Sequence, residues 1–191
     1  MDINDIFETL RIAVGEKLDA NKKVALAIDG CAASGKTTLG EMLSDYFDAP
    51  VVHTDDFFLR PPQRTAERYA EPGGNIDYER FSVEVLPHII SHDAFEYRKF
   101  DCGKMALGDS VRIHENDLII VEGTYACHEK FIDSYNIKAM LTINEKEQRR
   151  RILLRSGAAR LADFEEKWIP LEKEYFSRCS IADKCDFVFS V

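Results

Sequence analysis

The sequence lacks three features, and each absence removes a class of function. No run approaches the roughly 18 consecutive apolar residues of a membrane span, and the N-terminal segment has neither the basic nor the apolar stretch of a secretion signal. Basic residues are outnumbered, with 25 Lys and Arg against 34 Asp and Glu, whereas a protein that holds long nucleic acid needs a basic surface. We therefore expect a cytoplasmic protein that binds neither membranes nor nucleic acid.

Cysteine pairs are also missing. The five cysteines are odd in number and include no C-x-x-C pair. This pattern predicts neither a disulfide framework nor a zinc site, so reduced thiols are expected.

The hydrophobic pattern predicts the fold class. A chain of 191 residues with 45% hydrophobic content fits one compact domain, 1–191, that begins with an amphipathic helix within residues 1–22. Strand candidates alternate with helical segments, which predicts an α/β fold with a parallel sheet covered by helices on both faces. The two strongest apolar runs are residues 24–28 and 118–121, and the weaker ones are 50–53, 139–143 and 187–191. Residues 60–77, rich in proline and glycine, predict a long irregular loop of functional importance.

One motif carries most of the functional argument. Residues 30–37 match the phosphate-binding pattern G-x-x-x-x-G-K-[ST], directly after a predicted buried strand and before a helical pattern. In such a loop, backbone N–H groups surround a phosphate at the positive end of the next helix. The alternative is a glycine turn without a ligand. The predicted nucleotide-binding residues are Gly30, Cys31, Ala32, Ala33, Ser34, Gly35, Lys36, Thr37 and Thr38.

Three residues of this loop have individual predictions. Lys36, expected to face solvent, would bridge the β- and γ-phosphates of a nucleotide, and the Thr37 hydroxyl would bind Mg²⁺. Cys31 lies beside N–H groups that favour a thiolate, which predicts a reactive thiol.

Two acidic clusters follow predicted strands and are expected at the same sheet edge. In a parallel α/β sheet the carboxyl ends of the strands meet at the ligand crevice, so Asp55 or Asp56 would face the γ-phosphate. We favour Asp55 as the base that accepts the proton of an attacking hydroxyl; the alternative is that both acids cap a turn. Glu122 is placed to bind Mg²⁺, directly or through water, opposite Thr37, unless it is a surface charge.

A run of arginines lies on a predicted helix that begins near Asn144 and forms a lid over about residues 144–160. Arg151 and Arg155 are one turn apart, so both can reach one phosphate and neutralise charge on the transferring group. The alternative is a solvated charged face.

Together these motifs resemble the uridine kinase branch of the P-loop small-molecule kinases, a group similar to nicotinamide riboside kinases, pantothenate kinases and phosphoribulokinases. The resemblance rests on residues 30–38, 55–58, 74–78, 97–101 and 122–124. It implies a five-stranded parallel core with a helical lid, Mg-ATP as phosphoryl donor and a nucleoside 5′-hydroxyl as acceptor. It also implies acceptor contacts from Asp77 and the neighbourhood of Tyr97.

The residues themselves suit a polar, ring-bearing acceptor. A carboxylate such as Asp77 can bind sugar hydroxyls, and Tyr78 or Tyr97 can stack on a base, although aromatic residues more often pack in a core. The leading hypothesis is therefore a kinase for uridine or cytidine. The alternatives are a kinase for nicotinamide riboside, pantothenate or a sugar phosphate, and a nucleotide-binding sensor without turnover. ATP or GTP as donor, and a homo-oligomer, remain open.

Overall fold

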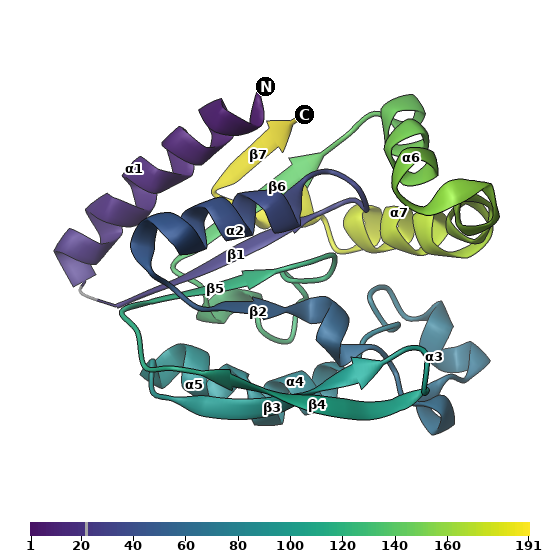
Figure 1. Cartoon of the computed structure of the whole chain (residues 1–191), viewed down its shortest axis with the longest axis horizontal. Helices are drawn as coiled ribbons and strands as arrows, with labels where there is room; N and C mark the ends of the chain where they lie inside the picture. The colour runs from purple at the N-terminus through teal and green to yellow at the C-terminus, as the bar shows by residue number, and fades with distance from the viewer. Residues whose placement is uncertain (22) are drawn as a thin grey trace.

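The computed structural model describes residues 1–21 and 23–191 and contains the predicted parallel sheet (Figure 1). Its five strands run in the order β2-β5-β1-β6-β7, and every neighbouring pair is parallel. Their bounds are β1 Val24–Gly30, β2 Val51–His53, β5 Leu118–Glu122, β6 Ile137–Thr142 and β7 Phe187–Ser190. The predicted fold class and all five strand positions are confirmed.

The central strands are buried on both faces, which explains their continuous apolar sequence. All residues of β1 and β5 are buried. Side chains alternate between the faces along a strand, so Leu26 and Ile28 belong to one hydrophobic cluster, whereas Ala25 and Ala27 belong to the other. Two cores therefore lie on opposite sides of one sheet.

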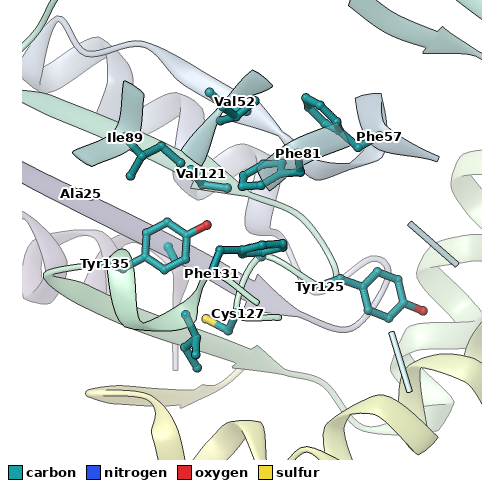
Figure 2. Close-up of a cluster of buried hydrophobic side chains, with 14 of the residues drawn as sticks. Ala25, Val52, Phe57, Phe81, Ile89, Val121, Tyr125, Cys127, Phe131 and Tyr135 are labelled. Carbon is teal, nitrogen blue, oxygen red and sulfur yellow. The ribbon is translucent and has the colours of Figure 1, made fainter. Parts of the chain in front are cut away.

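Different helices cover the two faces. α1 (Ile3–Asn21) and α2 (Lys36–Phe47) pack on one face through Ile6, Leu10 and Leu39. The other face packs against α4 (Tyr78–Glu84), α5 (Leu86–Ser91), α7 (Ile169–Arg178) and α8 (Ile181–Lys184). Figure 2 shows the aromatic centre of that second core, where Phe81 and Phe131 have ring centroids 4.4 Å apart. Lys22, the last residue of the predicted N-terminal helical segment, lies outside the described residues.

Two segments depart from the sequence prediction. Residues 60–77 are not a wholly irregular loop, because they contain the 3₁₀ turn η2 (Pro61–Gln63) and the helix α3 (Ala66–Ala70). The Thr65 hydroxyl accepts a hydrogen bond from the Arg68 N–H and caps α3, a local signal that the proline and glycine content obscured. The strands β3 (Phe95–Asp101) and β4 (Ala106–Ile113) form a separate antiparallel hairpin that was not predicted.

The predicted lid is a broken helix. α6 (Glu145–Asp163) begins where expected, because the Asn144 side chain accepts a hydrogen bond from the Glu147 N–H. Gly157, with φ 81° and ψ 171°, interrupts its helical backbone. A π-helical turn, η4 (Phe164–Trp168), then joins α6 to α7, so helical structure continues past residue 160. Short 3₁₀ turns lie at η1 (Thr54–Phe57) and η3 (Ile132–Ser134). Among the helices in the described ranges, none has both the length and the apolar character needed to cross a membrane.

Candidate active site

The phosphate-binding loop lies between β1 and α2, as its motif predicts. Gly30 adopts φ 146° where a Cβ would lie 2.1 Å from the Leu141 carbonyl oxygen, so only glycine fits there. Gly35 adopts φ 100° immediately before α2. Lys36, expected to face solvent, is instead 8% exposed, and its Nζ donates to the carbonyl oxygens of Gly30 and Cys31, both at 2.8 Å. These bonds place its ammonium across the mouth of the loop.

A buried carboxylate that sequence reasoning overlooked holds the base of this loop. Asp29 is fully buried, and its oxygens accept hydrogen bonds from the backbone N–H groups of Tyr125 and Cys127 and from the Tyr175 hydroxyl. Burial raises the pKa of Asp29 although these bonds oppose the rise. Asp29 thus ties the end of β1 to the segment after β5 and to α7.

The predicted magnesium ligands lie side by side. The Thr37 hydroxyl is 3.3 Å from both carboxylate oxygens of Glu122, and His53 Nδ1 is 2.5 Å from Glu122 Oε1. The hydrogen bond to Glu122 raises the pKa of His53. In the described residues no group of three or more His, Cys, Asp or Glu side chains could hold a metal ion. The Thr37 hydroxyl and the Glu122 carboxylate nevertheless fit Mg²⁺, which commonly takes its other ligands from water and substrate phosphates.

The two neighbouring acids of η1 have different surroundings. Asp55 is accessible within a cavity, and removal of water by the surrounding protein raises its pKa against the pull of Lys36. Asp56 lies outside that cavity, where its Oδ2 accepts a hydrogen bond from the Tyr97 hydroxyl at 2.9 Å. The structure therefore brings Asp55, but not Asp56, to the phosphate loop.

A single cavity of about 710 Å³ collects most of the predicted residues. This volume is typical of small-ligand sites. Its predicted members are Ala32, Ala33, Gly35, Lys36, Thr37, Thr38, Asp55, Glu122, Arg151 and Arg155. Gly30, Cys31 and Ser34 do not line it. A second hollow of about 420 Å³, between Phe47 and residues 115–118, contains none of the predicted residues.

The lid contributes arginines to the cavity. Arg151 binds Glu147 and donates from Nη1 to the Ala33 carbonyl oxygen at 3.3 Å, so the lid contacts the phosphate loop directly. Arg155 has no ion pair in the described part of the chain. Arg160, beyond the break at Gly157, also lines the cavity.

Three predicted acceptor-binding residues lie outside the cavity lining. Asp77 is fully buried, caps α4 by accepting from the Arg80 N–H, and pairs with Arg60 Nε at 3.2 Å. The Tyr78 hydroxyl donates to Glu71, and the Tyr97 hydroxyl donates to Asp56. These contacts occupy their polar atoms, and their role toward an acceptor stays a prediction.

The remaining cavity wall was not predicted. Its members include Phe58, Arg64, Asn75, Arg160, Phe164, Trp168 and Glu172. Phe58 directly follows η1, and Arg64 and Asn75 belong to residues 60–77. The others come from α6, η4 and α7. The available signals were the functional expectation for residues 60–77, which provide Arg64 and Asn75, the resemblance over residues 55–58 and 74–78, which include Phe58 and Asn75, and the predicted lid, which includes Arg160.

Glu172 connects α7 to the phosphate loop. Its Oε2 accepts hydrogen bonds from the Ala32 N–H at 3.1 Å and from Gln148 Nε2 at 3.3 Å, while Gln148 also donates to the Ala32 carbonyl oxygen. Burial raises the pKa of Glu172 to about 7. A carboxylate that keeps its proton near neutral pH can lie beside a phosphate-binding loop with little repulsion.

The Glu172→Gln variant should therefore change the pH dependence of stability. Between the ordinary carboxyl pKa and about 7, folded protein holds a proton that unfolded protein releases, so the free energy of unfolding falls as pH rises through that range. Glutamine removes this loss. We expect the melting temperature of the variant to exceed that of the parent by about 7 to 14 °C at pH 8 and to match it near pH 4.5.

Thermal melts from pH 4.5 to 8.5 make this measurement. Glu174→Gln is the matched control, because Glu174 lies on the same helix and makes a surface pair with Arg178. A parent and a Glu172→Gln variant with parallel pH profiles would contradict the raised pKa.

Cys31 does not have the environment predicted for it. Burial, followed by the nearby Glu172 carboxylate, raises the pKa of the Cys31 thiol to about 11. The expectation of a reactive thiolate is therefore wrong, because desolvation outweighs the effect of the neighbouring N–H groups and of Lys36.

Comparisons with known proteins place this geometry in a known fold. No protein-family model matches the chain, and no curated protein matches it. Among solved structures, a protein from Bacillus stearothermophilus described as a possible uridine kinase has 20% sequence identity and a TM-score of 0.70, over 99% of this chain and 100% of that one. A candidate fructose transport system kinase from Silicibacter sp. TM1040 has 19% identity and a TM-score of 0.71, over 96% and 98%.

A third solved structure is similar at lower identity. It is YFH7 from Saccharomyces cerevisiae, described as a candidate P-loop kinase with a circular permutation, with 11% identity and a TM-score of 0.65 over 100% of this chain and 99% of that one. These likenesses, together with the strand order and the phosphate loop, show that the chain has the fold of P-loop kinases.

Proposed function

We propose that this protein is a phosphotransferase that uses Mg-ATP to phosphorylate a hydroxyl group of a small molecule. The observation that carries the proposal is that one cavity is lined by Lys36 at the start of α2, Asp55 in η1 and Glu122 at the end of β5. A phosphate loop alone suits many nucleotide-binding proteins. A carboxylate that faces that loop from the end of β2 adds what hydroxyl activation needs.

Each residue has a distinct role in the proposed transfer. Lys36 and the loop N–H groups bind the donor phosphates, and Thr37 and Glu122 hold Mg²⁺, which supplies charge neutralisation when bound. Asp55 accepts the proton of the acceptor hydroxyl, whose oxygen bonds to the γ-phosphorus. The bond from that phosphorus to the βγ-bridging oxygen breaks, and ADP leaves with the electron pair. Arg151 and Arg155 stabilise the negative charge.

The nucleoside acceptor predicted from the sequence depends on Asp77, Tyr78 and Tyr97, and none of them lines the cavity. Uridine and cytidine are therefore not favoured over nicotinamide riboside, pantothenate and sugar phosphates as the acceptor. A non-catalytic nucleotide sensor remains a second candidate function, which the same experiment tests.

The test is an acceptor panel with a coupled readout of ADP release. We expect Mg-ATP to bind and one class of acceptor to stimulate ADP release at least about tenfold over the rate without acceptor. Binding of Mg-ATP without stimulation by any acceptor, in a panel that covers neutral, cationic and anionic hydroxyl compounds, would favour the sensor.

A further inference from the structure

Arg64 differs from the other arginines of its neighbourhood. Arg60 pairs with Asp77, Arg68 with Glu79, and Arg80 with Glu84. Arg64 makes no ion pair with any described residue; its Nε donates to the Leu59 carbonyl oxygen, and its guanidinium lies 5.5 Å from the Phe100 ring centroid. Its side chain is half-buried and lines the cavity. In a chain with a net charge of −9, a cation left without a carboxylate is available to a ligand.

A second donor lines the same cavity without a partner. Asn75 is 4% exposed, and its Nδ2 makes no hydrogen bond of normal geometry with the described residues. Its side chain lies near the Tyr125 hydroxyl, where it opposes the rise that burial causes in the pKa of that phenol. The backbone fixes its position, because Ile76 bridges Phe58 and because the preceding Gly74 packs so closely on the Arg68 carbonyl oxygen that a Cβ would lie 2.1 Å from it. A buried amide N–H₂ without an acceptor costs free energy unless a ligand provides one.

Arg64 lies near the proposed base. The Cys102 thiol lines the cavity, and after burial the charges that most affect its pKa are Arg64, which lowers it, and Asp55, which raises it. The Cys102 thiol is therefore near enough to both Arg64 and Asp55 for each charge to affect its pKa. A molecule that presents a hydroxyl to Asp55 can place another group against Arg64.

The cationic side chains that line the cavity outnumber the carboxylates. Five cations line it, namely Lys36, Arg64, Arg151, Arg155 and Arg160, against three carboxylates. Lys36 and Arg151 contact the phosphate loop, where the donor would bind, whereas Arg160 and Arg64 both lower the pKa of the Cys102 thiol. Arg64 and Asn75 come from residues 60–77, on the chain segment that contains α3 and lies across from α6 and α7 (Figure 1).

We infer that the acceptor carries an oxyanion, a phosphate or a carboxylate, which Arg64 and Asn75 bind while the acceptor hydroxyl faces Asp55. This inference rests on the proposed kinase function and selects among its acceptors. It disfavours the neutral nucleosides uridine and cytidine and the cationic nicotinamide riboside, and it favours sugar phosphates and hydroxy acids.

Binding is tested separately from turnover. Trp168, the single tryptophan of the chain, lines the cavity with its ring 6.1 Å from that of Phe58, so its fluorescence reports occupancy. Protein saturated with Mg²⁺ and a non-hydrolysable ATP analogue is titrated with ribose 5-phosphate against ribose, with pantothenate against pantothenol, and with uridine. The first pair tests a phosphate and the second a carboxylate.

We expect at least one anion to bind about 10- to 100-fold more tightly than its neutral counterpart and than uridine. The same compounds are then assayed for ADP release. Uridine binding as tightly as every anion would overturn the inference and leave the kinase proposal intact. Failure of the ATP analogue itself to bind would instead overturn the kinase proposal.

Substitutions of Arg64 and Asn75 test whether these two side chains bind the anion. Arg64→Met keeps the length of the side chain, and we expect it to weaken binding of the preferred anion about 10- to 100-fold with affinity for the ATP analogue unchanged. Asn75→Asp places a negative charge at the same wall and should weaken the anion further, whereas Asn75→Ala should have a smaller effect.

Arg98→Met is the matched control, because Arg98 also makes no ion pair with a described residue but donates to the Leu107 and Gly108 carbonyl oxygens of the hairpin, outside the cavity. Equal losses in the Arg64 and Arg98 variants, or no loss in Arg64→Met, would contradict the assignment.

Discussion

Lys36→Ala is expected to lower the rate of ADP formation about 10²- to 10³-fold and to weaken ATP binding, because among the described residues it removes the only lysine that lines the cavity. The alanine variant also loses the two hydrogen bonds from Nζ to the Gly30 and Cys31 carbonyl oxygens. Since Lys36 is buried, we expect a loss of about 1 to 3 kcal/mol in the free energy of unfolding as well. Turnover must therefore be measured well below the melting temperature of the variant.

The control for Lys36→Ala is Lys23→Ala. Lys23 is exposed and also donates to a backbone carbonyl oxygen, that of Ser91, but it lies just before β1 and away from the cavity. It should retain parental turnover. Near-normal turnover in the Lys36 variant would show that this loop is not the donor site.

Asp55→Asn should lower the chemical step about 10²- to 10⁴-fold while side-chain volume and nucleotide affinity change little. Asparagine cannot accept the proton of an attacking hydroxyl. The raised pKa of Asp55 has a further consequence for the parent enzyme: the base is progressively protonated as pH falls, so the acidic loss of kcat should begin at a higher pH than for an ordinary aspartate.

Asp56→Asn is an internal control of identical chemistry one residue away. The amide oxygen of the variant can still accept from the Tyr97 hydroxyl, and position 56 does not line the cavity, so we expect turnover within about tenfold of the parent. Pre-steady-state measurement of the first turnover separates the chemical step from product release in both variants. A crippled Asp56 variant beside an active Asp55 variant would reverse the choice of base.

The sheet was predictable because its signals are local. β1 and β5 are continuous apolar runs, and burial on both faces is the physical reason for that pattern. The hairpin β3–β4 was not predictable in the same way, because its burial alternates unevenly and a register shift lies between Arg98 and Phe100. The break at Gly157 was also invisible, since glycine is tolerated within helical patterns.

The residues of the candidate site likewise include some that local sequence signals predict and some that they do not. The phosphate loop, Asp55 and Glu122 follow predicted strands, and parallel topology brings strand ends together, so their proximity could be expected from sequence. Arg64, Asn75 and Glu172 come from segments whose position depends on tertiary packing. Charge pairing distinguishes the arginines there: Arg60, Arg68 and Arg80 each have a carboxylate partner, whereas Arg64 has none among the described residues.

Two glycines of this chain are required for different reasons. At Gly30 an added Cβ would clash with the Leu141 carbonyl oxygen. Even alanine is therefore excluded there, both by this clash and by the backbone conformation. At Gly157 an added Cβ would meet no atom of the described residues within 4 Å, and only the φ of 81° opposes it. The penalty at Gly157 is therefore about 1 to 3 kcal/mol of backbone strain whatever the size of the substituent. A steric clash therefore limits substitution at Gly30, whereas the preference of L-residues for negative φ alone limits it at Gly157.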